Sequence, residues 1–194
     1  MKKNNHYESA FAQYLHSREI PYLSTRETQR SFAGQEEYGS LKNIDFLVLN
    51  RSTCLNDPQV YPAGGREKNE SAEKIDGCSW LIDIKGRRFP SGQAHPQYWR
   101  NWVSEDDLLS LSRWETIFGV GFQGLLVFAY DVLDQRSPIE RSRLFEYQNH
   151  FYAFLGIPLK TYYRNCRTLS PKWRTVAMPG VQFRKSVIPL DELL

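Results

Sequence analysis

Cysteine is scarce in this sequence of 194 residues. Its three cysteines, Cys54, Cys78 and Cys166, are odd in number and too widely spaced for a CxxC metal knuckle. Such a set provides neither a disulfide framework nor a thiolate zinc site. The sequence therefore fits a reducing compartment, and we expect a cytoplasmic protein.

Long apolar runs are also missing. No stretch approaches the roughly 18 apolar residues that a membrane-spanning helix needs. The basic opening, Met1 to His6, is not followed by an apolar segment, so it does not have the pattern of a secretory signal. We expect no membrane partner.

The signatures of several enzyme classes are absent. The sequence has no GxSxG elbow and no Walker phosphate loop, and its four histidines lack metal-ligand spacing. Residues 119–124 do read G-x-G-x-x-G, but a dinucleotide site needs this pattern between a strand and the helix that follows. Here the pattern follows a predicted helix and precedes a predicted strand, so we interpret it as a turn.

Charge is distributed unevenly along the chain. Residues 136–185 contain ten Lys or Arg and two Asp or Glu, whereas residues 1–135 contain fifteen and eighteen. A basic block of this kind is typical of polyanion-binding proteins, although a solvated surface can have the same composition. We expect a core domain at 1–135 and a basic C-terminal extension at 136–194 packed on it.

The apolar patterning predicts an α/β fold. Ser104 is a good N-cap, and the acidic residues that follow it complement the helix dipole. Residues 50–79 lack periodicity and are predicted to be an inserted loop. The predicted elements are helices at 7–18 and 105–118, and strands at 20–25, 44–49, 80–85 (ended by Gly86), 124–130 and 150–155.

Three charged residues lie on two of these apolar strands. Asp83 and Lys85 are two positions apart and share one strand face, and Asp45 lies on the preceding strand. A buried unpaired charge is costly, but a shared divalent cation such as Mg²⁺ or Mn²⁺ would compensate the two carboxylates. Lys85 would then stabilise the attacking water or the phosphate charge. The alternative is a salt bridge at a strand end.

This arrangement resembles the PD-(D/E)xK nuclease superfamily over roughly residues 7–131. The resemblance implies a restriction-endonuclease-like mixed central sheet flanked by helices. It also implies that Asp45 and Asp83 bind the metal and that Lys85 is the catalytic lysine. Glu8 matches the first-helix glutamate found in several branches, including archaeal Holliday-junction resolvases, and is expected to bind the metal directly or through water.

The sequence departs from the superfamily pattern at two places. Ile44 stands where the proline of the name would be, a common replacement. The gap from Asp45 to Asp83 is lengthened by the 50–79 insertion.

Basic residues outside this set are predicted to contact nucleic acid. Gly86 and two arginines follow the lysine, and the arginines are placed either to clamp phosphates or to form a polar turn that leaves the strand. A later stretch interleaves basic and aromatic residues. The alternative for that stretch is a helix that buries Tyr162 and Tyr163 while its charges stay exposed. The predicted contact residues are Arg87, Arg88, Lys160, Arg164, Arg167, Lys172 and Arg174.

These observations predict a Mg²⁺- or Mn²⁺-dependent endonuclease acting on DNA, in repair, recombination or restriction. A homodimer is left open. One alternative is a non-catalytic nucleic-acid-binding module on the same fold. Another is an interaction protein whose basic surface binds an acidic partner.

Overall fold

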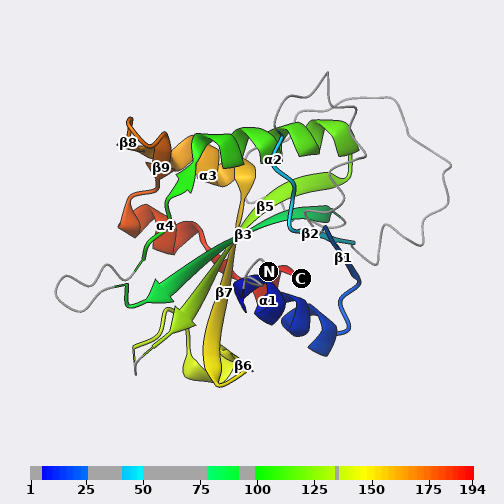
Figure 1. Cartoon of the computed structure of the whole chain (residues 1–194), viewed down its shortest axis with the longest axis vertical. Helices are drawn as coiled ribbons and strands as arrows, with labels where there is room; N and C mark the ends of the chain where they lie inside the picture. The colour runs from blue at the N-terminus through cyan, green and yellow to red at the C-terminus, as the bar shows by residue number, and fades with distance from the viewer. Residues whose placement is uncertain (1–5, 26–40, 50–77, 92–98, 134–135) are drawn as a thin grey trace, which may run out of the picture.

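A mixed β-sheet with helices on both faces forms the centre of the chain (Figure 1). The computed structural model describes residues 6–25, 41–49, 78–91, 99–133 and 136–194. The helices are α1 (His6–Ser17), α2 (Glu105–Phe118), α3 (Leu159–Asn165), α4 (Gly180–Ser186), α5 (Leu190–Leu193) and the short 3-10 helix η2 (Arg141–Arg143). The strands are β1 (Tyr22–Ser24), β2 (Phe46–Val48), β3 (Ser79–Phe89), β4 (Val103–Ser104), β5 (Phe122–Val132), β6 (Phe145–Tyr147), β7 (His150–Pro158), β8 (Arg167–Ser170), β9 (Thr175–Ala177) and β10 (Ile188–Pro189).

The central sheet has the strand order β1-β2-β3-β5-β7-β10, and β6 pairs with the outer part of β7. The long strands β3 and β5 are parallel, from Ser79 opposite Phe122 to Phe89 opposite Val132. Their other neighbours are antiparallel. A second, small sheet has the order β4-β9-β8. The expected mixed α/β architecture is therefore confirmed.

The C-terminal part of the chain is more deeply integrated than the sequence predicted. Residues 136–194 do not form an extension packed on a finished core, because β6, β7 and β10 are strands of the central sheet. Six consecutive residues of β7, from Tyr152 to Ile157, are buried. The extension was predicted from the basic composition of the whole segment. The basic residues lie mainly outside β7, on α3, β8 and α4, so this composition did not reveal the strand.

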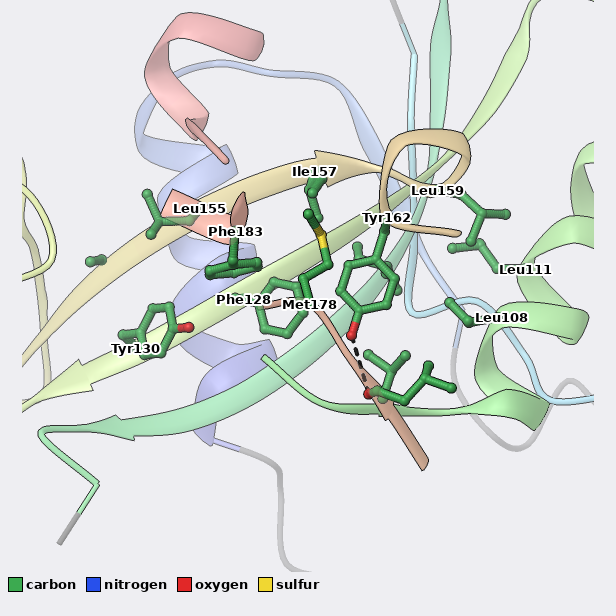
Figure 2. Packing of buried hydrophobic residues seen from close by; sticks show 14 of the residues in the cluster. Leu108, Leu111, Phe128, Tyr130, Leu155, Ile157, Leu159, Tyr162, Met178 and Phe183 are labelled. Atoms are coloured by element: carbon green, nitrogen blue, oxygen red, sulfur yellow. Dashed lines mark hydrogen bonds between the residues drawn. The ribbon is translucent and has the colours of Figure 1, made fainter. Parts of the chain in front are cut away.

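Each face of the sheet carries its own hydrophobic core. On one face, Phe11 and Leu15 of α1 pack against Ile82 and Val127. The other face is covered by α2, α3 and α4, and Figure 2 shows the side chains that meet there. The members labelled in that view are Leu108, Leu111, Phe128, Tyr130, Leu155, Ile157, Leu159, Tyr162, Met178 and Phe183.

The ends of α2 follow the predicted signals. Ser104 Oγ accepts a hydrogen bond from the Asp107 amide, and an Asp107 carboxylate oxygen accepts one from the Ser104 amide, which completes a capping box. At the other end, Gly119 and Gly121 have φ angles of 76° and 94°, which favour glycine. The G-x-G-x-x-G segment is therefore the α2–β5 turn, as predicted.

Gly86 does not end its strand, contrary to the prediction, since β3 continues to Phe89. The ring of Tyr7 occupies the space beside this glycine. A Cβ atom built on Gly86 would lie 2.2 Å from Tyr7 Cδ2. The glycine thus allows α1 to approach the strand closely. The predicted 50–79 loop lies, up to residue 77, outside the described residues.

Candidate active site

Asp45 lies one residue before strand β2 begins, beside the part of β3 that extends beyond its pairing with β2. Its backbone amide makes the last ladder contact, donating to Ile82 O at 2.8 Å. The next amide along β3, that of Ile84, donates instead to Asp45 Oδ2 at 2.6 Å. The carboxylate thus takes the position of a missing backbone carbonyl, and this directs it towards β3 beside Asp83.

Asp83 and Lys85 share one face of β3, as the strand period predicts. Leu81 precedes them on this face and belongs to the core under α2. Lys85 Nζ lies 2.7 Å from Asp83 Oδ2, and the two side chains are only 13% and 17% exposed. The contact is an ion pair in a largely dehydrated place, where electrostatic interactions are strong.

A second carboxylate, Asp107, also contacts the lysine, and the sequence analysis did not assign it to the site. Asp107 Oδ2 lies 3.0 Å from Lys85 Nζ. Its other oxygen, Oδ1, lies 2.7 Å from Lys42 Nζ, which also donates to Ser104 Oγ at 3.1 Å. The only signal in the sequence was local, because Asp107 is the third residue of a capping box. Its second role requires α2 to pack on β3.

The electrostatics of the two strand carboxyls reflect crowding of negative charge. Burial and the neighbouring charge of Asp83 raise the pKa of Asp45 well above its ordinary value, and the Ile84 amide offsets only part of this rise. Burial also raises the pKa of Asp83, although Lys85 opposes the rise. The Asp45 side chain makes a smaller contribution that lowers the pKa of Asp83.

In the pair formed by Lys85 and Asp107, the charged form of each group is favoured, unlike in Asp45 and Asp83. Burial alone would lower the pKa of Lys85, but Asp83 and Asp107 together raise it, so the ammonium form is favoured. Burial alone would likewise raise the pKa of Asp107, but Lys85 and Lys42 hold that pKa well below its usual range. Both groups are therefore charged at neutral pH.

Glu8 approaches the site from the other face of the sheet. It is half-buried in the first turn of α1, and its charge contributes to the raised pKa of Asp45. The neighbouring Tyr7 packs on Gly86, which brings the start of α1 to the part of β3 that follows Lys85. The structure thus brings Asp45, Asp83 and Lys85 together and places Glu8 within electrostatic reach.

The donor set suits a hard cation with incomplete protein coordination. Within the described ranges, no group of three His, Cys, Asp or Glu side chains is close enough to hold a metal ion. Asp45 and Asp83 provide two adjacent carboxyls, and Mg²⁺ usually binds through one or two carboxylates while keeping several waters. Asp83 Oδ2 is buried and, in the described part of the chain, accepts no well-directed hydrogen bond.

The two arginines that follow Lys85 lie in different environments. Arg87 is half-buried, donates to the Trp102 carbonyl at 2.5 Å and stacks over the Trp102 ring at 4.2 Å. A second donation, to Gly86 O at 2.7 Å, anchors its guanidinium further. Arg88 is exposed. Arg87 therefore has structural contacts of its own, whereas Arg88 faces solvent.

The other predicted contact residues lie on the segment from α3 to the β8–β9 turn. Arg174 is joined to this end of the helix by ion pairs of 3.2 Å with Glu105 and with Asp106. Of the two tyrosines in the segment, Tyr162 is fully buried whereas Tyr163 is 63% exposed. The remaining predicted contacts are also exposed, on α3, β8 and the β8–β9 turn: Lys160, Arg164, Arg167 and Lys172.

Comparison with known proteins shows the fold. No protein-family model matches the sequence, and no curated protein does. Among solved structures, the chain is similar to Archaeoglobus fulgidus Hjc, a Holliday junction resolvase from an archaeal hyperthermophile, with a TM-score of 0.51 and 11% sequence identity. The match covers 98% of each chain. No described helix is long and apolar enough to cross a membrane. The chain therefore shares, along its whole length, the fold of this resolvase.

Proposed function

We propose that this protein is a metal-dependent endonuclease that hydrolyses phosphodiester bonds in DNA. The observation that carries the proposal is the meeting of Asp45 and Asp83 at the end of β2, with Lys85 2.7 Å from the second carboxylate. Two carboxyls with raised pKa values beside a charged lysine are typical of a catalytic site. The nuclease fold of the chain supports the same assignment.

Each residue has a distinct role in this proposal. Asp45 and Asp83 would hold Mg²⁺ or Mn²⁺, and Glu8 would contribute directly or through water. A cation held there would supply Lewis acidity. The Lys85 ammonium orients the attacking water and stabilises the negative charge that develops on the phosphate. The backbone amide of Ile84 keeps the Asp45 carboxylate in place through its 2.6 Å hydrogen bond.

DNA is the proposed substrate because exposed basic residues gather on α3, β8 and the β8–β9 turn, and Arg174 joins that turn to the start of α2. Lys and Arg side chains neutralise backbone phosphates without reading sequence. Arg88, Lys160, Arg164 and Arg167 are proposed to do so here. The likeness to a Holliday junction resolvase makes branched DNA a substrate to include in any test.

The decisive experiment is cleavage of a DNA panel with Mg²⁺, with Mn²⁺ and with a chelator. The panel contains a single strand, a duplex, a bulged duplex and a four-way junction. Wild type is compared with Lys85→Met, which keeps the apolar stem of the side chain and removes its charge. We expect metal-dependent cleavage by wild type and a loss of about a hundredfold or more in the variant.

A matched control is Lys42→Met, which removes the exposed lysine on the far side of Asp107. It should retain cleavage to within a few-fold, and both variants should bind DNA in chelator. If wild type cleaves no member of the panel with either cation, or if Lys85→Met cleaves as fast as wild type, the nuclease assignment is wrong.

A non-catalytic nucleic-acid-binding module is the second candidate. It is favoured by the double ion pairing of Lys85 with Asp83 and Asp107, because a lysine paired on both sides can serve a structural role alone. This candidate predicts salt-dependent DNA binding without any response to divalent cations. Thermal stability with and without Mn²⁺ therefore separates the two candidates.

A further inference from the structure

The β8–β9 turn presents an exposed tryptophan to solvent. The Trp173 side chain is 71% exposed, although tryptophan is usually well buried. Its backbone amide donates to Ser170 Oγ at 3.4 Å, and Arg174 after it has a φ of 45°, so the chain reverses sharply at this point. The ring is thus held at the tip of a short hairpin rather than inside the fold.

The chain segment that carries this ring is basic, and the two carboxylates beside the turn, Glu105 and Asp106, are paired with Arg174. Between Glu146 and Asp191 the sequence contains seven Lys or Arg and no Asp or Glu. Lys172 Nζ lies 5.4 Å from the centre of the Trp173 ring, and Arg167 is exposed on β8. An aromatic face within a cationic surface complements a ligand that has both negative charge and flat rings.

The hairpin also has a defined position relative to the candidate active site. Strand β9 pairs with β4, which leads directly into α2. The ion pairs of Arg174 with Glu105 and Asp106 hold the turn against the first residues of that helix. The next residue, Asp107, is the ion-pair partner of Lys85. Figure 1 shows β8 and β9 beside the N-terminal end of α2.

Stacking on this ring requires a base that is not already stacked. Bases inside a duplex are covered on both faces, whereas an unpaired base can lie on an aromatic side chain irrespective of its identity. The neighbouring cations would hold the flanking phosphates. A neutral protein partner would not pair with the cations, and an intact duplex would offer no free base to stack on the ring.

We propose that the β8–β9 hairpin binds an unpaired nucleotide of the DNA substrate, with its base stacked on Trp173, its phosphate held by Lys172, and the adjoining strand contacted by Arg167 at the other end of β8. This inference rests on the proposed function, since it takes DNA as the ligand of the candidate site. It adds a substrate class to that function, namely DNA with unpaired or distorted bases next to the cleaved strand.

The test measures binding without cleavage, in the presence of a chelator. The probes are a fluorescein-labelled oligo(dT) strand, a blunt duplex of the same length, and that duplex with an unpaired bulge. Fluorescence anisotropy gives the dissociation constants for wild type, Trp173→Ala and Trp173→Phe. Val120→Ala is the matched control, because Val120 is 93% exposed at the opposite end of α2.

We expect Trp173→Ala to bind the single strand and the bulged duplex about tenfold more weakly, with little change for the blunt duplex. Trp173→Phe should recover most of the affinity, and Val120→Ala should match wild type. Lys172→Ala should weaken all three complexes and reduce their salt dependence.

Two results would overturn the inference. One is equal affinity of wild type and Trp173→Ala for the unpaired probes, and the other is an equal loss on all three probes. In both cases wild type still binds DNA, so the proposed function survives. If wild type binds none of the probes, both the inference and the DNA assignment fail. The cleavage assay of Lys85→Met tests only the catalytic role of Lys85, and its result does not bear on the binding of DNA by the hairpin.

Discussion

The ammonium of Lys85 lies 3.0 Å from the carboxylate of Asp107, so an ion pair joins the central strand β3 to the first turn of α2. Asp107 also caps that helix through Ser104 and contacts Lys42. One carboxylate therefore couples the start of a helix to the position of the lysine beside Asp83. A movement of the first turn of α2 would therefore move the Lys85 ammonium relative to Asp83.

Replacement of Asp107 by asparagine should lower stability at neutral pH by about 1.5–3 kcal/mol, because charged hydrogen bonds to two lysines are lost. The pKa of Asp107 is depressed in the folded state. Its contribution is therefore present above the ordinary carboxyl pKa and is lost as the pH falls through the depressed value. Urea unfolding at several pH values should show a difference that narrows below about pH 4.

The neighbouring Asp106 offers a control for this prediction. Its side chain is 52% exposed in its pair with Arg174, so Asp106→Asn should cost less than about 1 kcal/mol. A constant difference between wild type and Asp107→Asn across the whole acid range would contradict the assigned pKa direction.

Asp45→Asn should be at least as stable as wild type at neutral pH in chelator. The pKa of Asp45 is raised in the folded state, so ionisation destabilises the fold as the pH rises from the ordinary carboxyl value through the raised one. Asparagine cannot ionise, but its carbonyl can still accept from the Ile84 amide. The advantage of the variant should therefore disappear as the pH falls towards about 4.

Denaturant unfolding of Asp45→Asn and Asp45→Ala from neutral to acid pH checks this prediction. Alanine removes the acceptor as well, so this variant should carry an additional cost of about 1–3 kcal/mol at every pH. If Asp45→Asn is less stable than wild type by the same amount throughout, the carboxylate is stabilising and the predicted sign is wrong.

Mn²⁺ should raise the melting temperature of wild type but not that of Asp83→Asn. A cation that binds only the folded protein stabilises it by about 2.7 kcal/mol at a hundredfold excess over its dissociation constant. Without metal, Asp83→Asn should be no less stable than wild type, because a buried carboxyl with a raised pKa is removed and Lys85 keeps Asp107 as its partner.

Thermal melts with Mn²⁺ and with a chelator decide between the metal site and a structural salt bridge. The salt bridge predicts identical melting of wild type in both buffers and lower melting of Asp83→Asn in both. That outcome would exclude the metal site at Asp83.

Gly86→Ala should destabilise the protein by about 1–3 kcal/mol, since its Cβ would lie 2.2 Å from the Tyr7 ring. In a Tyr7→Ala background, where the ring is absent, Gly86→Ala should lower the free energy of unfolding by only a small fraction of that amount. A double-mutant cycle by chemical denaturation measures this coupling. Equal costs in both backgrounds would show that Tyr7 does not cause the restriction at Gly86.

Local patterns in the sequence determined the two long helices, the main strands of the central sheet and the residue types of the candidate site. Strand alternation was sufficient to place Asp83 and Lys85 on one face, because the side-chain period of two is a property of the extended backbone. The capping signal at Ser104 likewise defined the start of α2, since its hydrogen bonds join residues three positions apart. These interactions depend on neighbours in the chain and can be read without the fold.

Tertiary structure alone decided which distant residues complete the site. Asp107 meets Lys85 only because α2 packs across the sheet. Asp45 turns towards Ile84 only because the pairing of β2 with β3 begins at the next residue, Phe46. The assignment of β7 to the central sheet and the continuation of β3 through Gly86 also depend on long-range packing. Contacts between residues far apart in the chain form when apolar faces are buried together, and no local period encodes which faces will meet.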